Sequence, residues 1–153
     1  MKGFKGIRAL NIMHRGMMLG LVTFGAITLF LVSSSTFTPA LANMDRILQV
    51  IGILLAVGGV FAGISIFRKK LLQARDLQGT GEEKFAIYRS ASLIQWALLD
   101  FPCIFNIIAF FLTGNYAFLA LVGVLLILFA LYTPSRARAL VQLQLSEEEL
   151  ANI

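Results

Sequence analysis

The sequence predicts an all-α fold, a polytopic membrane protein whose four transmembrane helices form one bundle with both termini in the cytoplasm. Four apolar stretches, at residues 12–32, 48–67, 90–112 and 116–132, reach or approach the ~20 residues that a helix needs to cross ~30 Å of hydrocarbon. Of 13 lysines and arginines, only Arg46 lies in the connections after the first and third stretches, which is the positive-inside pattern. A mean hydropathy of +0.83 with 14% charged residues excludes a disordered chain and an ordinary soluble domain.

The composition also limits the chemistry of the chain. The 153 residues have room for one membrane domain and a short cytoplasmic tail at 133–153. The net charge of +5 comes from bases that flank the helices, so we expect contact with anionic lipid heads and no nucleic-acid partner. Cys103 is the only cysteine and His14 the only histidine, which excludes an intramolecular disulfide, a zinc cluster and a bis-histidine haem site. Because the sequence also lacks HExxH, nucleophile-elbow and phosphate-loop motifs, we expect no enzymatic activity, no cofactor and no metal.

The first two spans carry glycines at helix-packing spacing. Gly16 and Gly20 in the first span, and Gly59 and Gly63 in the second, each form a GxxxG pair. Small residues at this spacing let two helices approach to backbone contact. We expect these glycines to pack helices within the chain, and a seam between two copies is the alternative.

An alternative interpretation makes the first stretch a signal peptide, because Ala40-Leu41-Ala42 resembles a signal-peptidase site. The apolar run ends near Val32, about eight residues before that motif, and a usual cleavage region is shorter. We therefore expect the first stretch to stay as a helix. Cleavage would leave three helices and an N-terminus outside the cytoplasm.

The first two connections differ in length and in charge. Residues 33–47 form an outer loop rich in turn residues. The longest connection, residues 68–89, is basic and lies on the inner side. Its sequence predicts a helical extension of the second span, a turn at Gly79 and Gly81, and a short amphipathic entry into the third span.

The last two spans form an antiparallel hairpin in this interpretation, because residues 113–115 are a tight turn. Pro134 marks the exit from the fourth span. Within the tail, residues 146–149 fit a capping box for a final helical turn.

Asp100 is the one acidic residue inside a predicted span, about 15 Å from the cytoplasmic start of that span. A carboxyl at that depth costs ~2.5–3.5 kcal/mol on insertion scales, so such residues face a bundle interior or a cavity. On a helical wheel the third span has a polar stripe within an arc of about 140°. The stripe consists of Ser92, Gln95, Trp96, Asp100, Cys103 and Asn106. We expect it to face neighbouring helices.

Two alternatives for Asp100 stay open. Pro102 removes its own N–H and pushes on the carbonyl four residues before it, so we expect a helix kink beside Asp100. No lysine or arginine lies at matching depth, which favours a neutral carboxyl. In one alternative the acid is structural and hydrogen-bonded to Gln95 or Asn106. In the other it binds a proton or a cation, with Ser92, Gln95 and Asn106 around it.

Three further side chains of the spans have structural interpretations. His14 is near the cytoplasmic end of the first span, where we expect an interfacial anchor, and a titrating group is the alternative. Trp96 lies about one turn from Asp100, deeper than an aromatic belt, and its indole N–H needs a partner. Cys103 is expected to fill space as a small apolar side chain.

Several of these segments together resemble a known class of proteins. The residues concerned are 88–94, Ala97-Leu98-Leu99-Asp100-Phe101-Pro102, Leu112-Thr113-Gly114-Asn115, and the tail from Pro134 to Glu148. They resemble a recurrent pattern in small four-helix bacterial inner-membrane proteins of unknown function. The resemblance covers most of the chain and implies a multi-pass protein of the bacterial inner membrane, with no established activity.

A second resemblance is local. The second and third spans with their basic connection resemble the helical hairpin of the proton-carrying c subunit of rotary ATPases, and the resemblance places Asp100 at the proton-binding acid. The chain departs from that family because it lacks the long alternating glycine run and the proline after the loop arginine, and because it adds Pro102 and two further spans. The resemblance is therefore an analogy for the behaviour of Asp100 and does not indicate a rotor.

From these features we expect a small accessory or assembly component of the membrane that acts through helix packing, without enzymatic activity. Its partners are the lipid bilayer and either further copies in a homo-oligomer or a larger membrane complex. The alternative function is a proton-linked or cation-linked permeation or sensing unit centred on Asp100.

Overall fold

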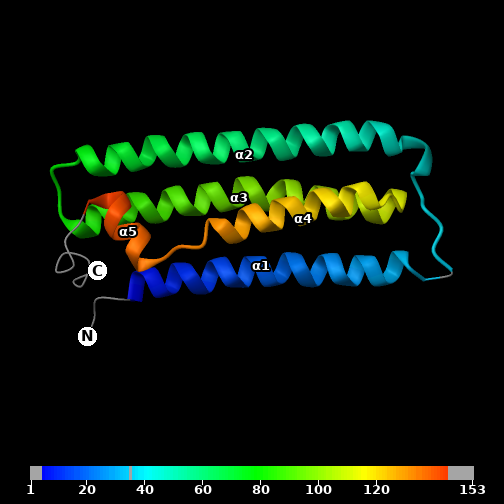
Figure 1. The fold of residues 1–153 in the computed structure, drawn as a ribbon, viewed down its shortest axis with the longest axis horizontal. Helices are drawn as coiled ribbons and strands as arrows, with labels where there is room; N and C mark the ends of the chain where they lie inside the picture. Colours follow the sequence, from blue (N-terminus) through cyan, green and yellow to red (C-terminus); the bar gives the residue numbers. More distant parts are fainter. Residues whose placement is uncertain (1–4, 35, 145–153) are drawn as a thin grey trace.

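The computed structural model describes residues 5–34 and 36–144, and in these ranges the chain is helical, without strands. Its elements are α1 (Lys5–Val32), the 3₁₀ turn η1 (Ala42–Met44), α2 (Asp45–Asp76), α3 (Gly81–Thr113), α4 (Tyr116–Leu131) and α5 (Arg136–Leu143). The predicted antiparallel hairpin of the last two spans corresponds to α3 and α4 (Figure 1). The capping box predicted at residues 146–149 lies outside the described residues.

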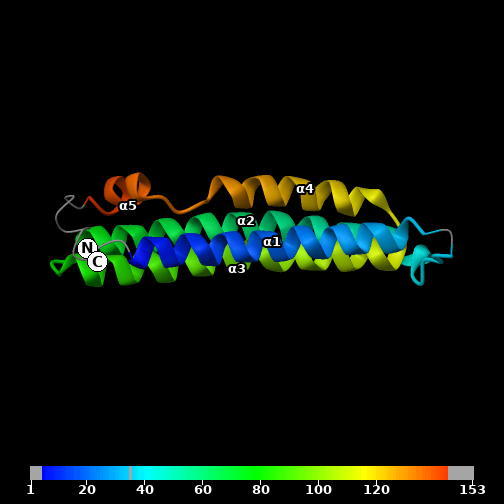
Figure 2. The same cartoon turned by 90° about the horizontal axis from the view of Figure 1, so that it is seen from below.

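α3 is the central helix of the bundle. It contacts α1 on one side and α2 on the other, and α4 lies against one face of this layer (Figures 1 and 2). In the most apolar window of each helix, 50% of α3 is buried, against 11% of α1 and 17% of α2. The outer surfaces of α1 and α2 are therefore both apolar and exposed, as lipid-facing surfaces are.

The helices differ in whether they can span a membrane alone. α1, α2 and α3 are long and apolar enough to do so. α4 has 16 residues, which corresponds to about 24 Å, and it passes the same test only together with α5, to which it is bent by 71°. The predicted class, an all-α chain with helices fit to cross a membrane, is confirmed at this level.

Three helices extend beyond the apolar stretches that predicted them, all at the end of the bundle where α5 lies. α1 begins at Lys5 instead of residue 12. α2 continues to Asp76 and α3 begins at Gly81, which confirms the helical extension and the helical entry predicted within residues 68–89. Hydropathy marks only the part of a helix that suits a membrane, whereas the helical hydrogen bonds continue until a cap or a turn ends them.

The turn between α2 and α3 lies where the two glycines predict it. Thr80 caps α3: the Glu83 N–H donates to Thr80 Oγ1 at 3.4 Å, and the Thr80 N–H donates to Glu83 Oε2 at 3.0 Å. This reciprocal pair is a capping box, which fixes the start of α3. α2 and α3 therefore form a long antiparallel hairpin with a short turn.

The opposite end of the bundle is closed by polar contacts. Gly114 adopts φ 70°, and its N–H donates to the Phe110 carbonyl at 2.8 Å, which ends α3. Asn115 caps α4 by accepting from the Ala117 N–H at 2.8 Å. Its Nδ2 also donates to the two carboxylate oxygens of Asp45 at 2.9 and 2.8 Å. These bonds join the start of α2 to the α3–α4 turn.

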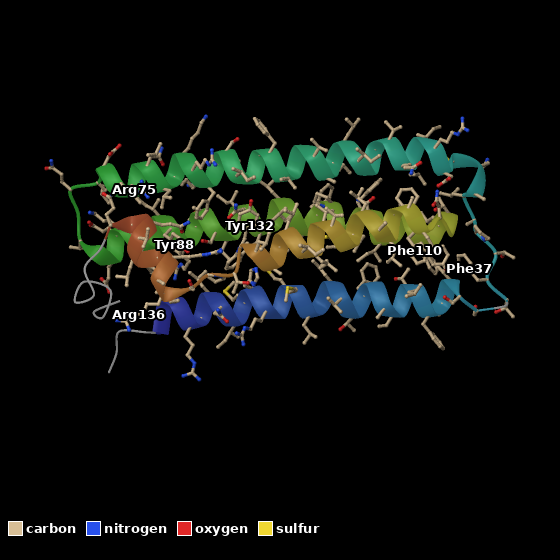
Figure 3. All side chains as sticks on the ribbon, in the orientation of Figure 1. Phe37, Arg75, Tyr88, Phe110, Tyr132 and Arg136 are labelled. Carbon is tan, nitrogen blue, oxygen red and sulfur yellow. The ribbon has the colours of Figure 1, made fainter. Side chains whose placement is uncertain are left out.

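Basic positions gather at one end of the bundle. Figure 3 shows Arg75 and Arg136 at the α5 end, with Phe37 and Phe110 towards the other end. Of the lysine and arginine positions in the described ranges, all except Arg46 lie in the half of the bundle that contains α5. The basic positions that form the positive-inside pattern in the sequence therefore lie together at the α5 end of the bundle.

Candidate functional site

The predicted polar stripe of α3 lies mostly inside the bundle. Ser92, Gln95, Trp96, Cys103 and Asn106 are buried, each with 4% or less of its surface exposed. Asp100 is the exception, because it is only half-buried. The stripe therefore faces neighbouring helices as expected, but its acid lies at the edge of the buried region.

Asp100 faces α1. It lines a cavity of about 240 Å³ between α1 and α3, together with Met17, Gly20, Leu21, Phe24 and Ile104. The expected hydrogen bond from Asp100 to Gln95 or Asn106 is not formed, and no other described residue bonds to the acid. At 100° per residue, Gln95 and Asn106 lie about 120–140° away around the helix. Asp100 faces α1, whereas Gln95 and Asn106 face α2, so the polar stripe does not form one site.

Asn106 and Ser92 bond mainly to α3 itself. The Asn106 Nδ2 donates to the Pro102 carbonyl at 2.8 Å and, at 3.5 Å, to the Gly52 carbonyl of α2, while its Oδ1 is buried without a partner among the described residues. The Ser92 hydroxyl donates to the Tyr88 carbonyl at 2.9 Å. Both side chains thus bond one turn back along their own helix, and neither is directed at Asp100.

Pro102 affects the contact between α2 and α3. α3 is helical on both sides of Pro102, but proline has no N–H to donate to the Leu98 carbonyl. That oxygen is directed at Gly59 of α2, where the Cβ of any larger residue would overlap it. A Cα–H of glycine can contact a carbonyl oxygen in this way at helix interfaces. The carbonyl freed by Pro102 is therefore used in the α2–α3 seam and does not surround Asp100.

The four glycines of the two GxxxG pairs have different surroundings. Gly59 and Gly63 lie against α3, and a Cβ on Gly63 would be 3.5 Å from both the Cγ and the carbonyl oxygen of Gln95. Gly16 and Gly20 lie on the exposed side of α1, and a Cβ on either would have no neighbour within 4 Å in the described chain. The expectation of packing within the chain therefore does not hold at Gly16 and Gly20, because neither glycine is in close contact with another helix, and Gly20 only borders the groove between α1 and α3.

His14 lies at a junction of three helices that the sequence did not reveal. Its ring is fully buried, stacks on Phe129 of α4 with centroids 4.6 Å apart, and meets Trp96 of α3 edge-on at 4.9 Å. His14 Nε2 is 2.9 Å from the Phe129 carbonyl oxygen, so this nitrogen carries a hydrogen and donates. The expected interfacial anchor is thus a core residue instead.

Two polar atoms of this cluster lack a partner in the described part of the chain. His14 Nδ1 and the Trp96 indole nitrogen are buried and form no hydrogen bond with the described residues. The partner predicted for Trp96 within the polar stripe is therefore not found. A buried polar atom without a hydrogen bond lowers stability.

His14 belongs to a buried seam of α1 that the sequence does not mark. The buried side chains of α1 are Leu10, His14, Leu21 and Thr28, at spacings of four, seven and seven residues. This is a narrow seam along one face of a helix. The sequence hides it because apolar side chains surround α1 on every side, so hydropathy does not distinguish the seam from the lipid-facing surface.

The described residues hold no group of three or more His, Cys, Asp or Glu side chains that could bind a metal ion. No protein-family model, no curated protein and no solved structure matches this chain.

Proposed function

We propose that this chain is a small integral membrane protein that acts as an accessory or assembly component through helix packing, without enzymatic activity. In this proposal α4 is the fourth span, both termini face the cytoplasm of a bacterial cell, and the protein lies in the inner membrane. The collection of basic positions at the α5 end supports this orientation. The exposed apolar surfaces of α1 and α2 support burial in lipid or against another membrane helix.

The position of Asp100 is the observation that carries the assembly role. The carboxyl is half-buried in the groove between α1 and α3 and receives no hydrogen bond from the described residues. A carboxyl near the middle of a bilayer is costly when it faces lipid, and another helix that covers it and donates a hydrogen bond lowers that cost. Gly20 lines the same groove and leaves room for a close approach.

The second candidate is a proton-linked or cation-linked unit centred on Asp100. The cavity beside the acid favours it, because an ion or a proton carrier needs access to the carboxyl. However, the cavity offers no second polar side chain. Its other lining residues are a glycine and four apolar residues, namely Gly20, Met17, Leu21, Phe24 and Ile104. A cation would therefore find one carboxylate and no further side-chain ligand, which favours the assembly role.

Substitution of Asp100 tests the assembly role. We expect Asp100→Leu to reduce association with the partner, whether a second copy or another membrane protein, about tenfold, and Asp100→Asn to retain it because the amide keeps the size and the hydrogen bonding. Association is measured by cross-linking in native membranes, followed by mass spectrometry of the purified complexes. Phe101→Leu is the matched control, since this adjacent side chain is 60% exposed and does not line the groove. Equal association of wild type and Asp100→Leu would contradict the assembly role.

The same variants separate the two candidates. If Asp100 cycles between charge states, Asp100→Asn abolishes activity while the protein stays folded and inserted. The wild type would then also react with a carbodiimide that modifies protonated membrane carboxyls, less readily at high pH. Under the assembly role we expect no labelling and an Asn variant that complements a deletion.

The four-span topology makes a separate prediction. A reporter that is active only outside the cytoplasm should be silent when fused at Ile153 and active when inserted near Thr38, because the two sites lie on opposite sides of the membrane. Reporter activity is measured in intact cells, with the amount of fusion protein as the control. An active fusion at Ile153 would indicate an odd number of spans.

A further inference from the structure

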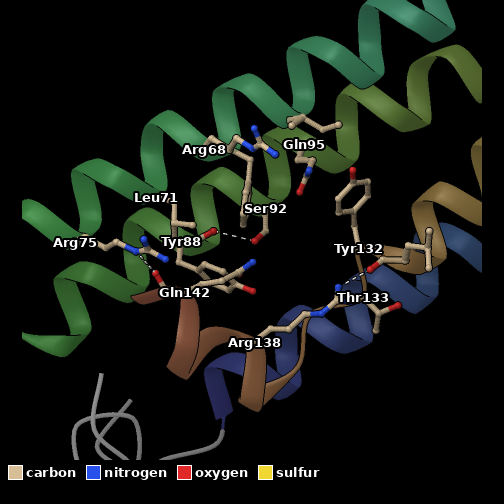
Figure 4. Close-up of a pocket in the computed structure, with 13 residues that line it drawn as sticks. Arg68, Leu71, Arg75, Tyr88, Ser92, Gln95, Tyr132, Thr133, Arg138 and Gln142 are labelled. Atoms are coloured by element: carbon tan, nitrogen blue, oxygen red, sulfur yellow. Dashed lines mark hydrogen bonds between the residues drawn. The ribbon is translucent and has the colours of Figure 1, made fainter. Parts of the chain in front are cut away.

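A second cavity, separate from the Asp100 groove, lies at the basic end of the bundle. It has a volume of about 620 Å³ and is lined by residues of α2, α3, α5 and the segment that joins α4 to α5 (Figure 4). It exists because α4 ends at Leu131 and α5 turns away by 71°, which leaves the groove between α2 and α3 uncovered at this level. We call this cavity the arginine pocket, after Arg68, Arg75 and Arg138, which line it.

The charge of the arginine pocket is not balanced by the described part of the chain. Its lining includes three arginines and no carboxylate. Arg75 Nε donates to the Gln142 carbonyl at 2.7 Å, and Arg138 Nη1 donates to the Leu131 carbonyl. Arg68 has no partner among the described residues. Among the described residues, two guanidinium groups thus use one N–H each, their other N–H groups have no partner, and the third guanidinium forms no hydrogen bond.

Backbone carbonyls hold two arginines of the pocket, Arg75, which is half-buried, and Arg138, which is exposed like Arg68. Arg75 and Arg138 each donate one N–H to a backbone carbonyl of a residue that lines the cavity, which keeps their charge beside it (Figure 4). Holding cations near each other costs energy, and an anion between them removes that cost.

The pocket also contains an unpartnered polar side chain and an apolar wall. Gln95 lines it, is 4% exposed and forms no hydrogen bond with the described residues. Ile64, Phe67 and Leu131 line the part that continues into the apolar stretches. Arg68 directly follows the second apolar stretch, which places the charges at the level of lipid heads when α2 spans a membrane. The pocket is thus positively charged at the level of the lipid headgroups and apolar at the level where the acyl chains begin.

We infer that the arginine pocket binds the phosphate of an anionic phospholipid from the surrounding leaflet. Guanidinium groups bind phosphate oxygens through paired N–H donors, and basic pockets between membrane helices hold anionic lipid heads. The apolar wall favours a lipid over soluble phosphate, although the two share the phosphate chemistry. This inference depends on membrane insertion, but it does not depend on the assembly role of Asp100.

Lipid titration of the full-length protein tests the inference. Protein purified in an uncharged detergent is titrated with phosphatidylglycerol and with phosphatidylcholine of the same acyl chains, and bound lipid is counted by native mass spectrometry. We expect phosphatidylglycerol to bind at least tenfold more tightly. Arg68→Gln should weaken its binding about tenfold and leave phosphatidylcholine unchanged, because a hydrogen bond to a charged group is lost.

Lys69→Gln is the matched control, since it removes one positive charge from the adjacent, exposed residue that does not line the pocket. We expect its affinity for phosphatidylglycerol to stay within twofold of the wild type. An unchanged melting curve for Arg68→Gln should show that the fold is retained, as Arg68 has no partner to lose among the described residues. Equal weakening in the two variants, or equal binding of the two lipids, would overturn the inference.

Inorganic phosphate distinguishes the two sources of the ligand. We expect millimolar phosphate to leave bound phosphatidylglycerol in place, because inorganic phosphate has no acyl chain to pack against the apolar wall. Displacement of the lipid by phosphate at these concentrations would assign the pocket to a soluble phosphate and overturn the lipid assignment.

Discussion

Replacing Gly59 with alanine is expected to destabilise the bundle by about 2–3 kcal/mol, because a methyl group at this position has no space. The added Cβ would overlap the Leu98 carbonyl oxygen and lie 2.9 Å from Pro102 Cγ. The oxygen belongs to the backbone of α3, so no side-chain rotation relieves the overlap. α2 and α3 would have to separate along their seam. The measurement is thermal or denaturant unfolding in a mild detergent, followed by circular dichroism.

Gly58 and Gly63 make this prediction specific. A Cβ on Gly58 would meet nothing within 4 Å, so Gly58→Ala should leave stability unchanged or raise it by up to ~1 kcal/mol through helix propensity. Gly63→Ala should fall between the two, because its Cβ neighbours lie at 3.5 Å and beyond, which is ordinary contact. If Gly59→Ala and Gly58→Ala unfold at the same temperature or denaturant concentration, α2 does not approach α3 closely at Gly59.

Replacing Trp96 with alanine should have the second large effect, a loss of about 2–3 kcal/mol. Trp96 is among the largest fully buried side chains and lies where α1, α3 and α4 meet, edge-on to His14, which stacks on Phe129. Its removal leaves a cavity, which costs about 3–5 kcal/mol in water-soluble cores. The loss is expected to be smaller here, since lipid is as apolar as the core and only the packing is lost. Circular dichroism on heating in detergent measures it.

The conservative variants at this junction should behave differently. Trp96→Phe keeps most of the ring contact and removes an indole N–H that has no partner among the described residues, so we expect stability close to that of the wild type. His14→Phe likewise keeps the stacking on Phe129 and removes an unpartnered nitrogen, but it loses the bond to the Phe129 carbonyl. A Trp96→Ala variant that melts like the wild type would mean that the three helices do not meet at this point.

The sequence predicted those features of the fold that depend on local chemistry. Apolar length predicted the helices, Gly79 and Gly81 predicted the α2–α3 turn, and residues 113–115 predicted the α3–α4 turn. Helix ends were predicted less well, because Thr80 and Ser135 cap α3 and α5 in segments that hydropathy marks only as polar. The short helix α5 was consequently expected as part of a tail.

Side-chain partners were harder to predict, because they depend on which helices are neighbours. The wheel of α3 located a polar stripe, but it did not show that α1 and α2 divide the stripe between them. Asp100 and Asn106 therefore face different helices. His14 was placed at the interface since its depth was measured from the start of the apolar stretch, whereas α1 begins at Lys5 and Phe129 lies far along the chain.

The distance along the chain between His14 and its partner has a consequence for biosynthesis. α1 contacts α3 and α4, which are made later, and the Phe129 carbonyl follows His14 by 115 residues. At about 5–20 residues per second, α1 waits in the membrane on the order of ten seconds before its last partner exists. During this interval α3 is available to α1 before α4 is. Docking of α1 is thus completed late in synthesis, when α4 adds Phe129 to the His14 junction.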